Sequence, residues 1–236
     1  NLTMQKRGLP VAYVACLGNA AQVGLAELAG AVLADERVTA LGMYVEGIDD
    51  APAFAALAEA ARAAGKGIVV VKSGKTEASR AAAASHTASL AGGGAASSAF
   101  LRQAGVAEVD TLAALIEVLT VFHVHGPGIG TRLCSLSCSG GEAGLVADLG
   151  ARAGMSFAPP TEGQKERLGA VLGPLVALAN PLDYHTFIWG DEAKKTATFT
   201  AMMSGNFDAT MLLLDWPNYE MSFWELLPES RHAQNR

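Results

Sequence analysis

The clearest structural pattern in the chain lies in residues 51–75, which read APAFAALAEAARAAGKGIVVVKSGK. Its first part has apolar side chains at helical spacing, and its second part is a short run of β-branched residues from Gly67 to Lys72. An Ala-rich helix followed directly by an apolar strand is typical of the βα units that build parallel sheets. The stretch therefore predicts an α/β fold.

The same alternation extends in both directions along the chain. We expect the remaining strands at Val11 to Leu17, Val38 to Val45, Val106 to Val109, Arg132 to Ser137 and Asp208 to Leu214. We expect the other helices at Ala20 to Ala34, Gly94 to Ala104, Thr111 to His123, Glu142 to Ala153, Glu162 to Val171 and Ala193 to Met203, beside Ala51 to Ala64. Strands alternating with helices in this way predict parallel sheets between two helical layers, a three-layer α/β/α arrangement.

A domain boundary is expected at residues 125–130, His-Gly-Pro-Gly-Ile-Gly, because three glycines and a proline disfavour regular structure. On each side of this segment a predicted strand runs into a glycine-containing turn and then into a helix. We therefore predict two related parallel-sheet domains, residues 1–125 and residues 131–236.

Composition restricts the classes of function. Half of the residues are apolar, 17% are charged and the net charge is −6, so the chain has a sizeable core and no basic stripe for a nucleic-acid partner. Glycines interrupt every long apolar run, which argues against a membrane helix.

The three cysteines favour a reducing cytoplasm. Cys134 and Cys138 lack the further ligands of a metal site, and we interpret them as structural thiols.

The most informative chemical motif is Ser85-His86-Thr87, because small hydroxyl residues and a nearby glycine-rich run indicate an exposed loop. Phosphoryl transfer through histidine needs a neutral imidazole that a second group orients. Glu46 closes a predicted strand, and the carboxyl ends of parallel strands are where ligands bind, so its carboxylate could orient the ring. The alternative is that His86 and Glu46 are ordinary solvated residues.

A second motif is Ser139-Gly140-Gly141, at which a predicted strand runs into a predicted helix. Backbone N–H groups and the helix dipole at such a turn favour a bound anion. The glycine spacing fits neither a P-loop nor a dinucleotide fingerprint. A tight turn without a ligand is the alternative, and residues 180–183, Asn-Pro-Leu-Asp, are interpreted as a turn that could line a site.

These motifs together resemble one family. The stretches Gly18-Asn19-Ala20, Tyr44-Val45-Glu46-Gly47-Ile48, Lys72-Ser73-Gly74-Lys75, Ser85-His86-Thr87, Ser139-Gly140-Gly141 and Asn180-Pro181-Leu182-Asp183 have the order and approximate spacing of the nucleoside-diphosphate-forming acyl-CoA synthetases, relatives of succinyl-CoA synthetase. The resemblance extends from about residue 10 to about residue 215. It implies that both domains are flavodoxin-like and that the activity is an acid–thiol ligation with a phosphohistidine and an acyl phosphate as intermediates.

The resemblance also implies roles for individual residues. His86 would carry the phosphoryl group and Glu46 would orient it. The expected phosphate-binding residues are Ser85, Thr87, Gly92, Ser139, Gly140 and Gly141, and the expected CoA-binding residues are Gly18, Asn19, Lys72 and Ser73. Coenzyme A and ATP or ADP with Mg²⁺ are the expected cofactors. The nucleotide and Mg²⁺ would be held mainly on a domain outside this chain, in which no metal ligands are expected.

We find neither a CoA-binding domain nor an ATP-grasp nucleotide-binding domain in the sequence. We expect the first strand and the CoA-contacting loop of the histidine domain to lie before residue 1. Turnover would therefore require the rest of the polypeptide or a partner subunit. We expect the complete enzyme to be an oligomer that activates a small carboxylic acid.

Two alternatives stay open. One is a catalytically degenerate regulatory or assembly subunit, favoured by Ala88 where the family has glycine after Ser-His-Thr. The other is a flavodoxin-like module that binds a small anion or nucleotide.

Overall fold

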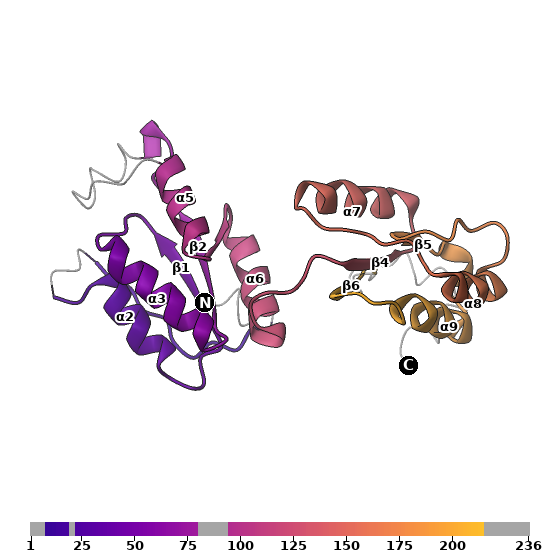
Figure 1. Cartoon of the computed structure of the whole chain (residues 1–236), viewed down its shortest axis with the longest axis horizontal. Coiled ribbons are helices and arrows are strands. Elements are labelled where there is room, and N and C mark those ends of the chain that lie inside the picture. Colours follow the sequence, from indigo (N-terminus) through magenta and orange to yellow (C-terminus); the bar gives the residue numbers. More distant parts are fainter. Residues whose placement is uncertain (1–7, 19–21, 80–93, 215–236) are drawn as a thin grey trace, which may run out of the picture. The chain divides into compact units, whose positions relative to one another are not determined.

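The computed structural model describes residues 8–18, 22–79 and 94–214. The chain divides into two compact units, Asn1–Gly128 and Ile129–Arg236. Each unit contains one sheet with helices beside it, as Figure 1 shows.

The sheet of the first unit has three parallel strands in the order β1-β2-β3. These strands are β1 (Ala40–Val45), β2 (Gly67–Lys72) and β3 (Ala107–Val109). The helices that lie wholly within the described part of this unit are α2 (Leu25–Leu33), α3 (Ala51–Ala63), α5 (Gly94–Gln103) and α6 (Leu112–His125). All strand pairs are parallel, which confirms the α/β prediction.

Local signals explain where these elements begin and end. The Asp50 side chain accepts a hydrogen bond from the Ala53 N–H and so caps α3. Thr111 caps α6 in the same way through the Ala114 N–H. At the other end of α6, Gly126 has a φ of 74°, which glycine adopts without the steric cost of a side chain.

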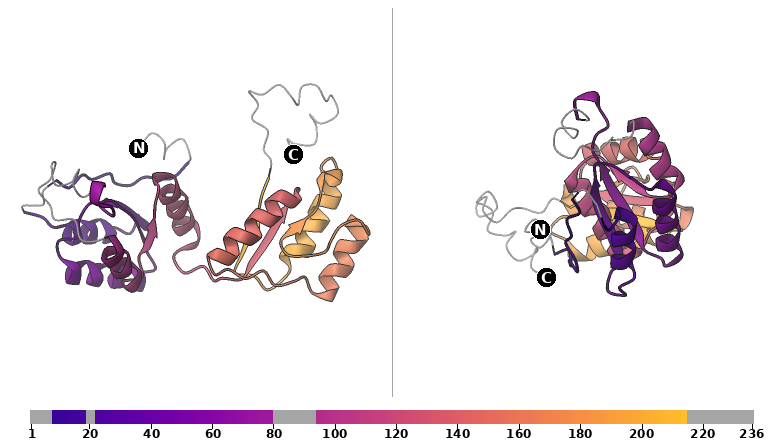
Figure 2. Two further views of the ribbon diagram at one scale, coloured as in Figure 1. Left: turned by 90° about the horizontal axis from the view of Figure 1, so that it is seen from above. Right: turned by 90° about the vertical axis from the view of Figure 1, so that its left-hand side faces the viewer.

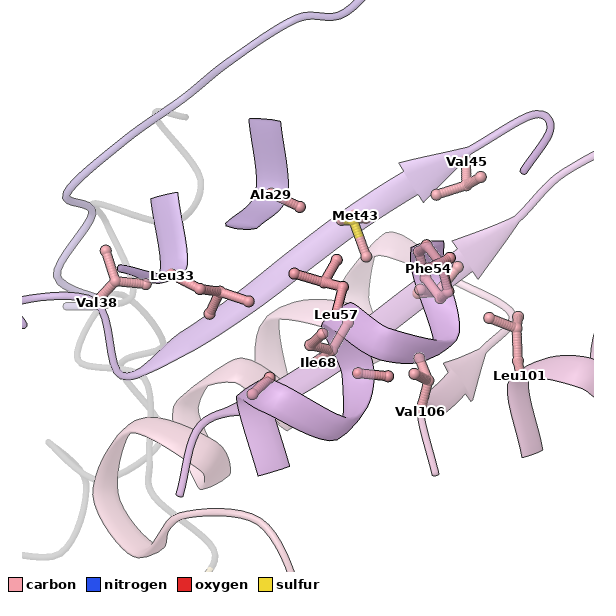
Figure 3. Close-up of a cluster of buried hydrophobic side chains, with 13 residues drawn as sticks. Ala29, Leu33, Val38, Met43, Val45, Phe54, Leu57, Ile68, Leu101 and Val106 are labelled. Carbon is pink, nitrogen blue, oxygen red and sulfur yellow. The ribbon is translucent and has the colours of Figure 1, made fainter. Parts of the chain in front are cut away.

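Both faces of the first sheet are covered. On one face, α2 and α3 pack on strand side chains that include Met43, Val45 and Ile68, as the close-up in Figure 3 shows. On the other face, Val69 and Val71 of β2 pack against Leu115 of α6. This unit is therefore a three-layer α/β/α structure, as predicted.

The second unit has another parallel sheet, with the strand order β5-β4-β6. Its elements are β4 (Leu133–Ser137), α7 (Gly140–Arg152), α8 (Glu162–Leu172), β5 (Leu182–Asp183), the 3-10 helix η1 (Thr186–Ile188), α9 (Glu192–Met203) and β6 (Ala209–Leu212). Helix α7 lies on one side of the strands, and α8 and α9 lie on the other (Figures 1 and 2). The buried side chains of α8 and α9 form one cluster with Leu136 and Leu182.

Two polar contacts hold the strand ends of the second unit together. The Arg132 guanidinium lies 2.6 Å from the Asp208 carboxylate, which links the starts of β4 and β6. The Asn180 side chain accepts a hydrogen bond from the Ser135 N–H at 3.0 Å and donates one to the Leu133 carbonyl at 2.8 Å. Asn180 thereby ties the chain before β5 to β4.

The structure corrects the predicted elements at two places. The strand expected at Val11 to Leu17 is wrong, because these residues have no regular secondary structure. The segment interpreted as a turn at residues 180–183 contains β5, which pairs with β4, and η1 follows it. The other expected strands and all expected helices are confirmed, with shifted ends; α7, for example, begins at Gly140 rather than Glu142.

Candidate functional site

Three predicted site residues of the first unit lie at the carboxyl edge of its sheet. Glu46 directly follows β1, Lys72 is the last residue of β2, and Ser73 follows it. The Ser73 N–H donates to the Val45 carbonyl at 3.0 Å, which extends the pairing of the two strands to this edge. The sheet therefore brings Glu46, Lys72 and Ser73 to one place.

Lys72 is 5% exposed although it carries an ammonium group. Its Nζ donates to the Glu46 carbonyl at 2.6 Å and also to the Ser73 carbonyl. Burial lowers the pKa of Lys72, while the carboxylates of Glu108 and Glu46 oppose this shift. The ammonium thus fastens the turn after β1 to the end of β2, and its contacts in this structure are with backbone carbonyls rather than with an open surface.

A second lysine organises the neighbouring part of this edge. The Lys75 ammonium forms ion pairs with Glu108 at 3.0 Å and with Asp110 at 2.9 Å, and these contacts raise the pKa of Lys75. Gly94, which begins α5, lies so close to Lys75 that a Cβ added to Gly94 would be 2.7 Å from the Lys75 carbonyl oxygen. The chain before residue 80 and the chain after residue 93 therefore meet at the edge where Glu46 lies.

Several predicted site residues fall outside the described residues: Asn19, Ser85, His86, Thr87 and Gly92. Gly18 is described and exposed, and it lines a large groove between residues 9–18 and β1. The contact between Glu46 and His86 stays a prediction.

The glycine motif of the second unit has the geometry expected from the sequence. Ser139 precedes α7 with extended backbone angles, and Gly140 and Gly141 form the first turn of the helix. The Ser137 hydroxyl donates to the Ser139 carbonyl at 3.1 Å. Since the first N–H groups of a helix have no intrahelical acceptor, this turn offers donors and a positive dipole end to an anion.

Asp183, the last residue of β5, and His185 lie beside this turn. A Cβ placed on Gly140 would lie 3.3 Å from Asp183 Oδ2, so the Asp183 carboxylate is next to the start of α7. Asp183 Oδ1 accepts a hydrogen bond from the His185 N–H at 2.9 Å, and His185 Nε2 lies 3.8 Å from Oδ2. His185 has a φ of 59°, which is uncommon for a residue with a side chain.

Sequence reasoning missed two features of these sites. The burial of Lys72 is one, because a lysine at a strand end is normally solvated; its only signal is its position in a continuous apolar run. The Asp183–His185 pair is the other. Among the described residues, no group of three or more His, Cys, Asp or Glu side chains could hold a metal ion, and no helix there is long and apolar enough to cross a membrane.

The comparison with protein families identifies the class of protein. A family model described as the succinyl-CoA ligase-like flavodoxin domain matches residues 2–122, slightly more than half of the 236 residues. The chain belongs to the nucleoside-diphosphate-forming acyl-CoA synthetase family. The flavodoxin-like fold expected from the sequence is therefore confirmed for residues 2–122.

Curated relatives agree with membership of the synthetase family. The chain is 31% identical over 181 residues to the ADP-forming acetate–CoA ligase II subunit alpha of Pyrococcus furiosus, covering 77% of this chain and 39% of that protein. It is 30% identical over 200 residues to a trans-feruloyl-CoA synthase of an unknown prokaryotic organism, covering 85% of this chain and 28% of that protein. The chain thus spans about two fifths or less of the length of these relatives.

Solved structures show the same fold. Acetyl-coenzyme A synthetase 1 of Ca. Korarchaeum cryptofilum, in complex with phosphate and ADP, matches with a TM-score of 0.78 and 24% identity. The match covers 88% of this synthetase-family chain and 45% of the solved chain. The apo form of the same enzyme matches with a TM-score of 0.72 and 25% identity.

Proposed function

We propose that this chain is the phosphohistidine-carrying part of an acyl-CoA synthetase that converts an acid, CoA and ATP into acyl-CoA, ADP and phosphate. The observation that carries the proposal is the carboxyl edge of the first sheet. Glu46 lies there, and the flanks of the segment that contains Ser85-His86-Thr87 meet there at Lys75 and Gly94. Ligands of open parallel sheets bind beyond this edge.

In the proposed mechanism, taken in the direction of ATP formation, phosphate displaces CoA from the acyl-CoA and gives an acyl phosphate. An imidazole nitrogen of His86 then attacks the phosphorus, the bond between phosphorus and the acyl oxygen breaks, and the free acid leaves. The phosphoryl group finally passes from His86 to a nucleoside diphosphate. Glu46 orients the imidazole through its other nitrogen, which keeps the attacking nitrogen unprotonated.

The other predicted residues have supporting roles in this proposal. Ser85, Thr87 and Gly92, together with Ser139, Gly140 and Gly141, supply donors to the phosphoryl oxygens, and Gly18, Asn19 and Ser73 contact CoA. For Lys72, which the sequence predicted to bind CoA, we propose a structural role instead. Its ammonium binds the Glu46 and Ser73 carbonyls and so fixes the shape of the turn after β1.

The relatives' lengths imply that this chain works with further protein. It spans 39% and 28% of the two relatives described above. We propose that residues 1–125 and 131–236 are two flavodoxin-like domains, and that a CoA-binding domain and a nucleotide- and Mg²⁺-binding domain are supplied by the same polypeptide or by a partner subunit. Since CoA and ATP are intracellular substrates, we propose a cytoplasmic location.

The test is phosphorylation of the complete synthetase, or of this chain with its partner subunit, by labelled ATP and Mg²⁺. The proposal predicts a label that is labile in acid, stable in base and lost in His86→Ala. The matched control His125→Ala removes a different histidine, which is exposed in the described structure, and keeps the label. Wild-type protein that binds nucleotide but takes up no label would contradict the proposal.

That negative result would favour a second candidate, a regulatory or assembly subunit without catalysis. The observation in its favour is Ala88, which stands where the family has glycine after the Ser-His-Thr motif. A methyl group restricts the backbone angles that glycine allows. Restoration of labelling by Ala88→Gly would identify this residue as the cause.

A further inference from the structure

One carboxylate of the first unit contacts both of the chain segments that flank residues 76–97. Glu108 is the middle residue of β3, and its Oε1 atom lies 3.0 Å from the Lys75 ammonium. The same oxygen accepts a hydrogen bond from the Ser98 hydroxyl at 3.0 Å. A carboxylate oxygen has two lone pairs, so it can accept from both donors at once. We call Lys75, Glu108 and Ser98 the Glu108 bridge, because together they link the chain after β2 to α5.

The backbone brings the two donors close to this carboxylate. Glu108 pairs in register with Val70 of β2, so it lies beside the strand that leads to Lys75. Gly74 has a φ of 74°, a left-handed conformation that turns the chain just before Lys75. At the start of α5, a Cβ added to Gly94 would lie 2.9 Å from the Lys75 Cα. The two flanks therefore touch directly beside the Glu108 bridge.

The second half of α5 is held by apolar packing and does not need the bridge. Leu101 is fully buried, and the centroid of the Phe100 ring lies 6.0 Å from that of the Phe54 ring of α3. Leu101 is the one buried residue among the ten residues of α5. The position of the first turn of α5 is therefore set mainly by the contacts of Gly94 and Ser98.

Exposure distinguishes the two carboxylates that pair with Lys75. The Glu108 side chain is 18% exposed, whereas the Asp110 side chain is 88% exposed. Water screens an exposed pair strongly, while a partly buried pair is screened less and keeps one geometry. The Glu108 carboxylate also opposes the lowering of the Lys72 pKa by burial, so a second ammonium is close to it. Glu108, rather than Asp110, is the carboxylate that fixes Lys75.

We propose that the Glu108 bridge holds the two flanks of the segment that contains His86 at the sheet edge where Glu46 lies, and that Glu108 is thereby a positioning residue for phosphoryl transfer. This role rests on the proposed function, in which His86 carries the phosphoryl group. Glu108 acts through Lys75 and Ser98 and does not contact the phosphoryl group. Displacing a reacting group by about 1 Å can cost about 100-fold in rate, so the bridge should be visible in the kinetics.

The test is single-turnover labelling of the complete synthetase, or of this chain with its partner subunit, by labelled ATP and Mg²⁺. Glu108→Val keeps a β-branched residue in β3 and removes both links of the bridge. We expect the rate constant of His86 labelling to fall about 10- to 100-fold. The final amount of label and the ATP concentration that gives the half-maximal rate should keep their wild-type values. Glu108→Gln keeps an acceptor oxygen for both donors and should recover most of the lost rate.

Asp110→Asn is the matched control, because it removes the other carboxylate that pairs with Lys75. It should label His86 within about twofold of the wild-type rate, since exposed pairs contribute little. Ser98→Ala and Lys75→Met each open the bridge on one side. Because one open side already releases a flank, the double variant should be no slower than the slower single variant.

Three results would overturn the proposal. The first is that Glu108→Val labels as fast as Asp110→Asn. The second is a smaller final amount of label at an unchanged rate constant, which would show loss of folded protein rather than loss of positioning. The third is that the rate losses of Ser98→Ala and Lys75→Met multiply in the double variant, which would mean that the two residues act separately.

A second readout does not depend on phosphorylation. In the chain alone, Glu108→Val should speed amide hydrogen exchange at residues 98–100 of α5 by about tenfold or more relative to Asp110→Asn. Equal exchange in the two variants would overturn the bridge itself. Wild-type synthetase without label on His86 would contradict the proposed function, and with it the role in phosphoryl transfer, while exchange still decides whether the bridge holds α5. The two failures are therefore distinguishable.

Discussion

Replacing Asp183 with asparagine should strengthen anion binding at the start of α7. The Asp183 carboxylate is next to Gly140, and its side chain is 24% exposed. A phosphate bound to the first N–H groups of α7 would lie roughly 4 Å from it, where two unit charges repel by about 1 kcal/mol in water and about 4 kcal/mol at an effective dielectric constant of 20. For this partly exposed site we expect a gain of about 1–2 kcal/mol, or about 5- to 30-fold in affinity.

Asparagine keeps the oxygen that accepts from the His185 N–H, so the local fold should survive. The lost charge near the helix start should cost about 0.3–1 kcal/mol of stability. Phosphate titration followed by the Gly140 and Gly141 amide resonances measures the affinity, and Asp191→Asn, at the N-cap of α9, is the matched control. Unchanged or weaker phosphate binding in Asp183→Asn would refute the reasoning that phosphate binds at the start of α7 and is repelled there by the Asp183 carboxylate.

Three further outcomes follow from packing and charge. Gly67→Ala should cost about 1–3 kcal/mol in urea unfolding, because its Cβ would lie 2.2 Å from the Phe122 ring; wild-type stability would contradict this. In the folded chain a thiol reagent should modify exposed Cys16 and leave Cys134 unmodified, since burial raises the Cys134 pKa to about 11. Mass spectrometry of the peptides shows which cysteine is modified, and modified Cys134 would contradict the prediction. Hydrogen bonds from Arg132 lower the Asp208 pKa to about 2. In an acid titration of unfolding, the stability advantage of the wild type over Asp208→Asn should therefore be full above pH about 5 and disappear as the pH falls towards 2. An advantage that persists at pH 2 would contradict this prediction.

The sequence predicted elements well where local preference and burial agree. Strand β2 has the predicted bounds, because its β-branched side chains are buried on both faces of the sheet. Helix α3 begins where predicted, since Asp50 caps it and Pro52 lies in its first turn. Strand β5 was missed because it has two residues, too few for any periodicity.

The sequence was misleading where a neighbour decides the structure. Residues 11–17 have strand composition, but a strand also needs a partner for its backbone, and no strand in the described part of the chain pairs with them. The contacts of Lys72 were also beyond the sequence, because they depend on the turn after β1 folding over the end of β2. Such features come from tertiary neighbours and leave no periodic pattern.

The most direct test of the central claim is to locate the phosphoryl group after the complete synthetase has reacted with ATP and Mg²⁺. Trypsin releases residues 81–102 as one peptide, and His86 is its only histidine. The account predicts that mass spectrometry at neutral or basic pH finds this peptide with one added phosphoryl group on His86. A phosphoryl group on another residue, with the peptide of residues 81–102 unmodified, would contradict it.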